Sequence, residues 1–119
     1  MARIFLVEDD ADVRAVIERA LSDCGHEVAA TSDYATAERA VLHAAFDLLI
    51  TDVSLPGGSG RGLGQEAALR GVPTLFITGD FGHMTALEAE GASLLRKPFR
   101  LQALHDAVSD LLGAAGAVR

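Results

Sequence analysis

The chain has no tryptophan, one tyrosine and a single cysteine, Cys24. One cysteine has no partner for an intrachain disulfide, which fits a protein of a reducing cytoplasm. Cys24 falls on the apolar face of an expected helix, and this position predicts a packed thiol. Basic residues are also in the minority, because 10 Lys and Arg stand against 17 Asp and Glu and give a formal charge of −7. That balance argues against nucleic-acid binding, since a duplex repels an acidic surface.

Long apolar runs are missing as well. No stretch approaches the roughly 18 apolar residues of a membrane helix, and a strand-like segment follows Met1 where a signal peptide would have a basic region. We therefore expect neither secretion nor membrane insertion, and a cytoplasmic location. The chain has 119 residues, half of them hydrophobic, which is enough for a real core. Residues 1–119 are expected to form a single domain.

Short apolar runs alternate along the chain with helical patterns. Continuous runs such as residues 4–7 and 48–50 are typical of strands buried on both faces, and therefore of a parallel sheet. The alternation predicts a doubly wound α/β sandwich of three layers, (βα)5, with strand order 2-1-3-4-5. The expected strands are residues 3–7, 27–31, 48–52, 74–78 and 93–96, and the expected helices are residues 11–24, 34–45, 63–69, 84–89 and 101–112.

Polar residues follow the carboxyl ends of these strands, where ligands of such sheets bind. Glu8 and Asp9 follow the first strand, Asp52 ends the third, Thr78 ends the fourth and Lys97 follows the fifth. Carboxylates brought together at one rim repel each other unless a cation lies among them, and hard oxygen ligands suit Mg²⁺. The sequence therefore predicts a magnesium site at this rim.

Asp52 is then the candidate nucleophile for phosphoryl transfer, because an aspartate can form an acyl phosphate when the charge is stabilised. Lys97 can supply a positive charge and Thr78 a hydroxyl donor to the phosphoryl oxygens. Taken singly, Asp52 and Thr78 also suit a cap or a turn. Asp10 is expected to cap the first helix, and the glycine-rich residues 57–60 to form a flexible loop over the site.

Four segments resemble the response regulator receiver (CheY-like) domain of two-component signalling: IFLVEDD (4–10), DVSLPGGSG (52–60), Thr78 and KPF (97–99). The resemblance covers essentially the whole chain and implies a flavodoxin-like fold. It also implies that a histidine kinase or a phosphotransfer protein donates the phosphoryl group, that an unnamed protein receives the signal, and that the Lys97-Pro98 bond is cis. By position, Asp52 resembles the family's phosphoacceptor. The family's Mg²⁺ ligands are matched by Asp52 together with Glu8, Asp9 and the backbone carbonyl of Ser54. Thr78 resembles the switch hydroxyl, and Lys97 resembles the phosphate-binding lysine.

The chain also departs from the family pattern. Leu94 stands where members usually carry Tyr or Phe, and the segments on either side of Thr78 are short, so helices 3 and 4 are expected to be shortened. Glycines at 79 and 82 predict a short or mobile fourth helix. Residues 73–80, PTLFITGD, partly resemble a subgroup of single-domain regulators with a Pro-Phe-x-Phe-Ala-Thr-Gly motif.

Two other functions stay open at this point. A small Mg²⁺ phosphatase of the haloacid-dehalogenase type also uses an aspartate nucleophile, but it needs a second aspartate where this chain has Ser54. A receiver-like module that binds a partner without phosphorylation is the other alternative, and Leu94 is its main support. We expect no enzyme beyond slow loss of the protein's own phosphoryl group.

Overall fold

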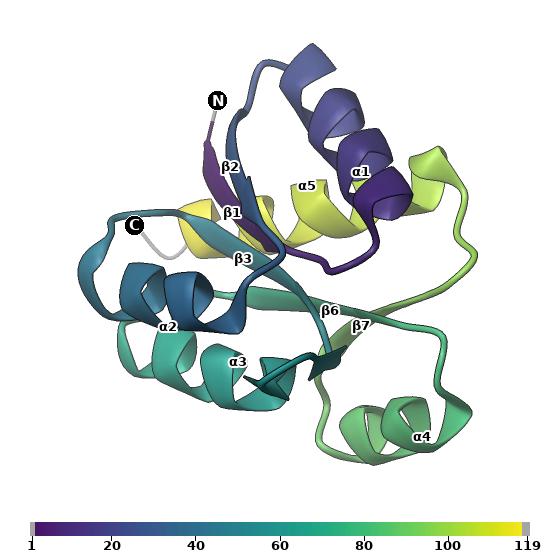
Figure 1. Ribbon diagram of the computed structural model, residues 1–119. Coiled ribbons are helices and arrows are strands. Elements are labelled where there is room, and N and C mark those ends of the chain that lie inside the picture. The colour runs from purple at the N-terminus through teal and green to yellow at the C-terminus, as the bar shows by residue number, and fades with distance from the viewer. Residues whose placement is uncertain (1, 118–119) are drawn as a thin grey trace.

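The computed structural model describes residues 2–117, in which one five-stranded sheet carries helices on both faces (Figure 1). The strand order is β2-β1-β3-β6-β7, and every neighbouring pair is parallel. Because β6 and β7 are the fourth and fifth strands of this sheet along the chain, the predicted doubly wound, flavodoxin-like order 2-1-3-4-5 is confirmed. The strands, all at their predicted positions, are β1 (Arg3–Val7), β2 (Glu27–Thr31), β3 (Leu48–Asp52), β6 (Thr74–Thr78) and β7 (Ser93–Arg96).

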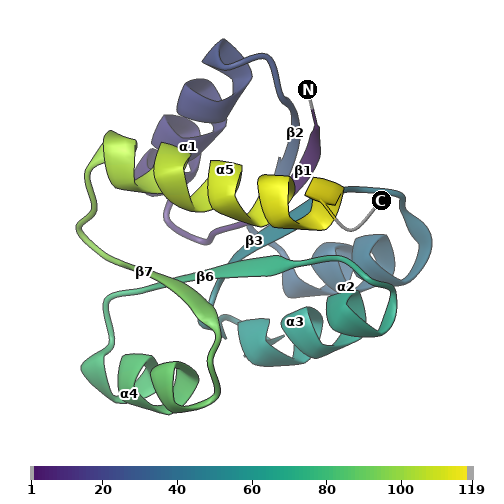
Figure 2. The same ribbon diagram turned by 180° about the vertical axis from the view of Figure 1, so that it is seen from behind.

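The helices form the two outer layers. Figures 1 and 2 show α1 (Ala11–Asp23) and α5 (Leu101–Ala117) on one face and α2 (Tyr34–His43) and α3 (Gly60–Leu69) on the other. The fourth helix, α4 (Phe81–Ala89), follows β6 and packs beside β7. The third and fourth helices have 10 and 9 residues, and each starts three residues earlier than the predicted ranges 63–69 and 84–89. No helix within residues 2–117 has the length and apolar character needed to cross a membrane.

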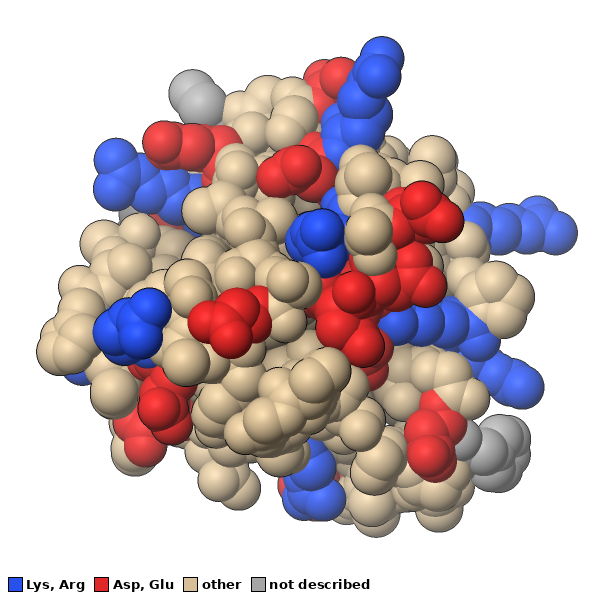
Figure 3. Space-filling model, in the orientation of Figure 1, with Lys and Arg blue, Asp and Glu red and all other residues tan. Residues whose placement is uncertain are grey.

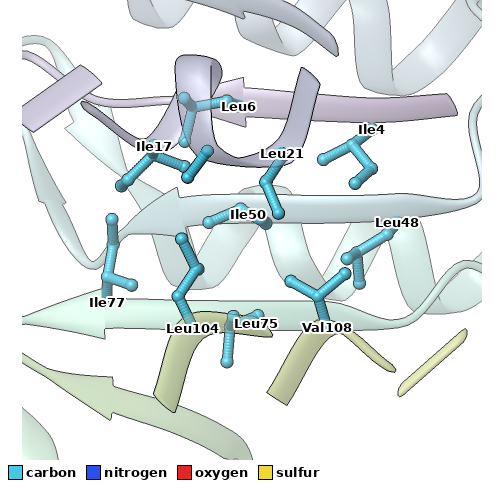
Figure 4. Packing of buried hydrophobic residues seen from close by; sticks show 11 residues of the cluster. Ile4, Leu6, Ile17, Leu21, Leu48, Ile50, Leu75, Ile77, Leu104 and Val108 are labelled. Carbon is cyan, nitrogen blue, oxygen red and sulfur yellow. The ribbon is translucent and has the colours of Figure 1, made fainter. Parts of the chain in front are cut away.

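Side chains of the central strands alternate between two cores. On one face, Ile4 and Leu6 of β1 and Ile50 of β3 point toward Ile17 and Leu21 of α1 (Figure 4). The other face buries the intervening strand residues against α2 and α3: Phe5, Val7 and Leu49 pack with Ala37, Val41, Leu63 and Ala67. Burial on both faces is the physical reason why continuous apolar runs predicted these strands. It also holds the strand ends at one fixed rim.

Side-chain caps begin four of the helices. Asp10 accepts hydrogen bonds from the backbone N–H groups of Asp12 and Val13, which confirms its predicted capping role in α1. Asp33, Ser59 and Asp80 cap α2, α3 and α4 in the same way.

Two local predictions fail where glycines are involved. Residues 57–60 are not an irregular loop, because β4 (Ser54–Leu55) and β5 (Gly58–Ser59) form an antiparallel hairpin and α3 starts at Gly60. The turn of this hairpin uses Gly57 at φ +89°, a conformation that other residues rarely adopt. The fourth helix starts at Phe81 and not at residue 84, because the Asp80 cap offsets the poor helix propensity of the neighbouring glycine.

Helix ends account for the other errors. The final helix does not stop before Gly113 but continues to Ala117, since the alanines that follow favour a helix. The first helix ends at Asp23, so Cys24 lies in its C-cap, exposed to solvent, and the predicted packed thiol is wrong. The second helix ends at His43 and not at residue 45.

Candidate functional site

The carboxyl ends of the strands bring the predicted site residues to one rim, beside the point where the strand order reverses between β1 and β3. Figure 3 shows a concentration of acidic side chains there, bordered by basic ones. Carboxylate oxygens of Glu8, Asp9 and Asp52 all lie within 4.8 Å of one another. The spatial convergence of these carboxylates, expected from strand ends alone, is therefore correct.

Lys97 approaches this cluster from the end of β7. Its Nζ donates hydrogen bonds to Glu8 Oε1 and to Asp52 Oδ2, the second at 2.8 Å. The backbone N–H of Lys97 donates to the Thr78 carbonyl at 2.9 Å, and the Lys97-Pro98 bond is cis, as predicted. The ammonium thus lies between two carboxylates from different strands.

Burial decides the charge balance at Glu8, whose side chain is 0 % exposed. Burial raises the pKa of Glu8 to about 7, although the Lys97 ammonium acts in the opposite direction. Burial also disfavours the charged form of Lys97, but hydrogen bonds to Asp52 and Glu8 outweigh it and raise the lysine pKa. Glu8 Oε2 is buried and has no hydrogen-bond partner among residues 2–117.

The unpartnered Glu8 Oε2 bears on whether the rim suits a hard cation. A buried carboxylate oxygen without a donor is costly, and a divalent cation beside it would supply the missing partner. Asp52, 13 % exposed, and the exposed Asp9 each place a carboxylate oxygen within 4.8 Å of a carboxylate oxygen of Glu8. The donor set therefore fits Mg²⁺, which keeps several waters and takes few protein ligands.

Thr78 ends β6 and is buried. Its hydroxyl accepts a hydrogen bond from the backbone N–H of Asp80 at 3.0 Å. Asp80 in turn caps α4 by accepting from Gly82 and His83. The prediction that Thr78 can begin a turn is therefore correct. The hydrogen bond of this turn connects the Thr78 hydroxyl to Asp80, the cap of α4.

Ser54 opens the hairpin that follows Asp52. Its side chain is exposed, and its backbone N–H donates to Asp52 Oδ1 at 3.3 Å. The chain returns tightly, because the Gly60 N–H donates to the Val53 carbonyl at 2.8 Å. A Cβ on Gly60 would lie 1.9 Å from the Asp52 carbonyl oxygen, so only glycine fits there.

Leu94 lies on β7 opposite Phe76 of β6. It packs against the small cluster of Val53, Phe76 and Leu87. A leucine thus fills the place where the family pattern has an aromatic side chain, and it links β7 to α4.

Sequence reasoning missed two residues at the rim. Arg14 Nη1 donates to the Glu8 carbonyl at 2.9 Å and so braces the acidic strand end from α1. Its position one turn after the Asp10 cap was the available signal. Gly60 was interpreted as part of a loop, although its place immediately after the Ser59 cap could have marked a close approach of the backbone.

The chain is similar to known proteins whose names agree with an acidic phosphoacceptor site. The model of the response regulator receiver domain matches residues 4–109. Regulatory protein VanRB of Enterococcus faecalis is 32 % identical over 98 % of this chain, which spans about half (54 %) of VanRB. Response regulator receiver protein CpdR of Brucella abortus is 32 % identical over 97 % of this chain and 100 % of CpdR. The crystal structure of a response regulator receiver protein from Sinorhizobium medicae superposes with a TM-score of 0.85, 29 % identity and 95 % coverage of both chains.

Proposed function

The chain belongs to the response regulator receiver family, whose members accept a phosphoryl group in two-component signalling, and we propose that Asp52 is its phosphoacceptor. The observation that carries this proposal is that the Asp52 carboxylate lies beside those of Glu8 and Asp9 and accepts a hydrogen bond from the ammonium of Lys97. A carboxylate oxygen of Asp52 attacks phosphorus while the bond from phosphorus to the donor breaks, and the donor keeps the electron pair.

Glu8, Asp9, Asp52 and the backbone carbonyl of Ser54 are the proposed ligands of Mg²⁺. When bound, the cation neutralises charge on the phosphoryl oxygens. The buried, unpartnered Glu8 Oε2 supports this assignment, because the oxygen needs a positive neighbour. Arg14 keeps the strand end that carries Glu8 and Asp9 in place.

Lys97 and Thr78 are the proposed donors to the phosphoryl group. Lys97 Nζ already contacts one oxygen of Asp52, so a small movement brings it to a phosphoryl oxygen on the same carboxylate. The Thr78 hydroxyl would exchange its contact with the Asp80 N–H for one with the phosphoryl group. That exchange would pass the signal to α4 and to Leu94.

We propose that the domain is no enzyme beyond slow loss of its own phosphoryl group. A phosphatase of the haloacid-dehalogenase type places a second carboxylate two residues after the nucleophile, and this chain has Ser54 there. Ser54 and Asp80 would flank the attacking water and set its rate.

The proposed donor is a histidine kinase or a phosphotransfer protein, and a cytoplasmic location stays a prediction. An apolar groove of about 460 Å³ adjoins the acceptor site and shares Lys97 with it. It is lined by Val13 and Val16 of α1 and by Pro98, Phe99 and Leu101 after β7. A donor protein that seats an apolar side chain there would bring its phosphohistidine close to Asp52.

The test is to incubate the chain with Mg²⁺ and acetyl phosphate and to measure its mass. We expect a gain of one phosphoryl group in the wild type and none in Asp52→Asn. Asp10→Asn is the matched control, because it makes the same atomic change next to the site and asparagine also caps helices. A phosphoryl adduct that persists in Asp52→Asn would contradict the proposal.

A further inference from the structure

We propose that Tyr34, which lies on α2 outside the acidic rim, is a positioning residue for the acceptor loop, residues 53–59. The inference deepens the proposed function and rests on it, because the acceptor loop carries the proposed Ser54 ligand. The residue does not touch the reacting atoms, and its effect passes through the β4–β5 hairpin.

The Tyr34 ring occupies the space in which a side chain at Gly58 would begin. A Cβ on Gly58 would lie 2.4 Å from Cε2 and Cζ of Tyr34 and 2.5 Å from Cδ2. Three ring carbons at nearly equal distance place that position over the face of the ring, since an approach to the edge would bring one carbon much nearer than the others. The Gly58 Cα therefore faces the ring, and the hydrogen that a Cβ would replace points at the tyrosine face.

Tyr34 also lies beside Gly57 in the turn of the hairpin and Gly62 of α3. A Cβ on Gly57 would lie 3.7 Å from the Tyr34 Cβ, and one on Gly62 would lie 3.9 Å from the tyrosine hydroxyl. On its inner side Tyr34 packs against the core cluster that contains the buried Leu55. The hairpin is thus anchored by its own buried Leu55, and the Tyr34 ring fills the space beside Gly58.

Backbone pairing connects this contact to the acceptor. Leu55 pairs with Gly58, and Ser54 pairs with Ser59. The Ser54 N–H donates to Asp52 Oδ1 at 3.3 Å. A displacement at Gly58 therefore moves Ser54, and with it both the hydrogen bond to Asp52 and the carbonyl proposed to bind Mg²⁺.

The experiment compares Mg²⁺ affinity across five variants by titration of the full chain. Tyr34→Ala and Gly58→Ala should each weaken binding roughly tenfold, the lower end of the range for groups that orient metal ligands. Tyr34→Phe should bind as the wild type does, because the ring and not the hydroxyl makes the contact. The double variant Tyr34→Ala/Gly58→Ala should be no weaker than either single variant, because the added methyl group meets the ring only when the ring is present. Gly62→Ala is the matched control, because its Cβ would make only an ordinary contact with the tyrosine hydroxyl at 3.9 Å.

A nuclear magnetic resonance signal reports the contact independently of Mg²⁺. One Gly58 Hα should be shifted upfield by the ring in the wild type and in Tyr34→Phe, but not in Tyr34→Ala. Loss of this shift in Tyr34→Ala without loss of Mg²⁺ affinity would overturn the positioning role. Losses of Mg²⁺ affinity that simply add in the double variant would overturn it too. Absence of Mg²⁺ binding in the wild type itself would instead refute the proposed metal site, and this inference with it. If Tyr34→Ala fails to fold, Tyr34→Leu and Gly58→Ala carry the same comparison.

Discussion

Lys97 Nζ lies 2.8 Å from Asp52 Oδ2 and also contacts the buried Glu8 carboxylate. The resting domain therefore uses the lysine as the counter-charge of its own acidic site, and a phosphoryl group would compete for the same ammonium. Substitutions at Lys97 and at Asp52 should therefore change the stability of the domain in opposite directions.

Removing the ammonium should destabilise the domain. Lys97→Gln leaves the buried Glu8 without its cation, and we expect a loss of about 2 kcal/mol, below the range for fully buried pairs because Lys97 is 22 % exposed. Urea denaturation in EDTA measures it. Mg²⁺ should restore part of the stability; equal stability of variant and wild type in EDTA would contradict this account of the contact.

Removing the Asp52 charge should have the opposite effect. Asp52→Asn relieves repulsion with Glu8 and Asp9, so the melting temperature in EDTA should equal or exceed that of the wild type. Millimolar Mg²⁺ should then raise the melting temperature of the wild type and leave that of the variant nearly unchanged, since only a site that binds the ion gains stability from it. A large fall in the melting temperature of Asp52→Asn would show that the carboxylate is needed for the fold.

The start of α4 should depend on pH. Hydrogen bonds from the His83 and Gly82 N–H groups lower the pKa of Asp80 below its ordinary value of 3.8. The folded-state pKa is the lower one, so the cap contributes fully above pH 3.8 and is lost as the pH falls through the folded pKa. Hydrogen exchange of the α4 amides measured between neutral and acidic pH tests this. Asp80→Asn should retain the cap and lose its pH dependence, and the same α4 response in both proteins would disprove the assignment.

Phosphorylation should be read out at α4. If the Thr78 hydroxyl turns to the phosphoryl group, the Asp80 N–H loses its acceptor, and amide shifts should concentrate in residues 80–87 and around Leu94. Thr78→Ser keeps a hydroxyl and should keep the response, whereas Thr78→Ala should lose it. Shifts of equal size in α1 and α4 would argue for another route.

The apolar groove beside Lys97 should affect the rate of phosphoryl transfer from a donor protein but not from a small phosphodonor. Val16 and Leu101 line the groove, and they are large hydrophobic residues that are 51 % and 45 % exposed. Val16→Lys and Leu101→Lys should slow transfer from a phosphorylated donor protein about tenfold, a loss of the size found for the minority of residues that dominate an interface. Both variants should leave the rate with acetyl phosphate unchanged. Leu69→Lys, at an exposed leucine on α3, is the control. Unchanged transfer to both groove variants would remove the groove from the account.

The sequence predicted the sheet and the rim well because both depend on burial. Runs such as residues 4–7 are apolar on both faces, so strand positions, order and the meeting of Glu8, Asp9 and Asp52 followed from pattern and topology alone. Helix ends and the hairpin were harder to predict. They depend on single side-chain caps such as Asp80, or on the contact between Gly58 and Tyr34, which joins residues far apart in the sequence.

The most direct test of the central claim is to locate the phosphoryl group. Borohydride reduces an aspartyl phosphate to homoserine, so the phosphorylated chain can be reduced with deuterated reagent and its peptides sequenced by mass spectrometry. We predict deuterated homoserine at position 52 and unmodified acids at positions 8 and 9. Label at another carboxylate, or phosphorylation with no label at Asp52, would contradict the assignment of Asp52 as the acceptor.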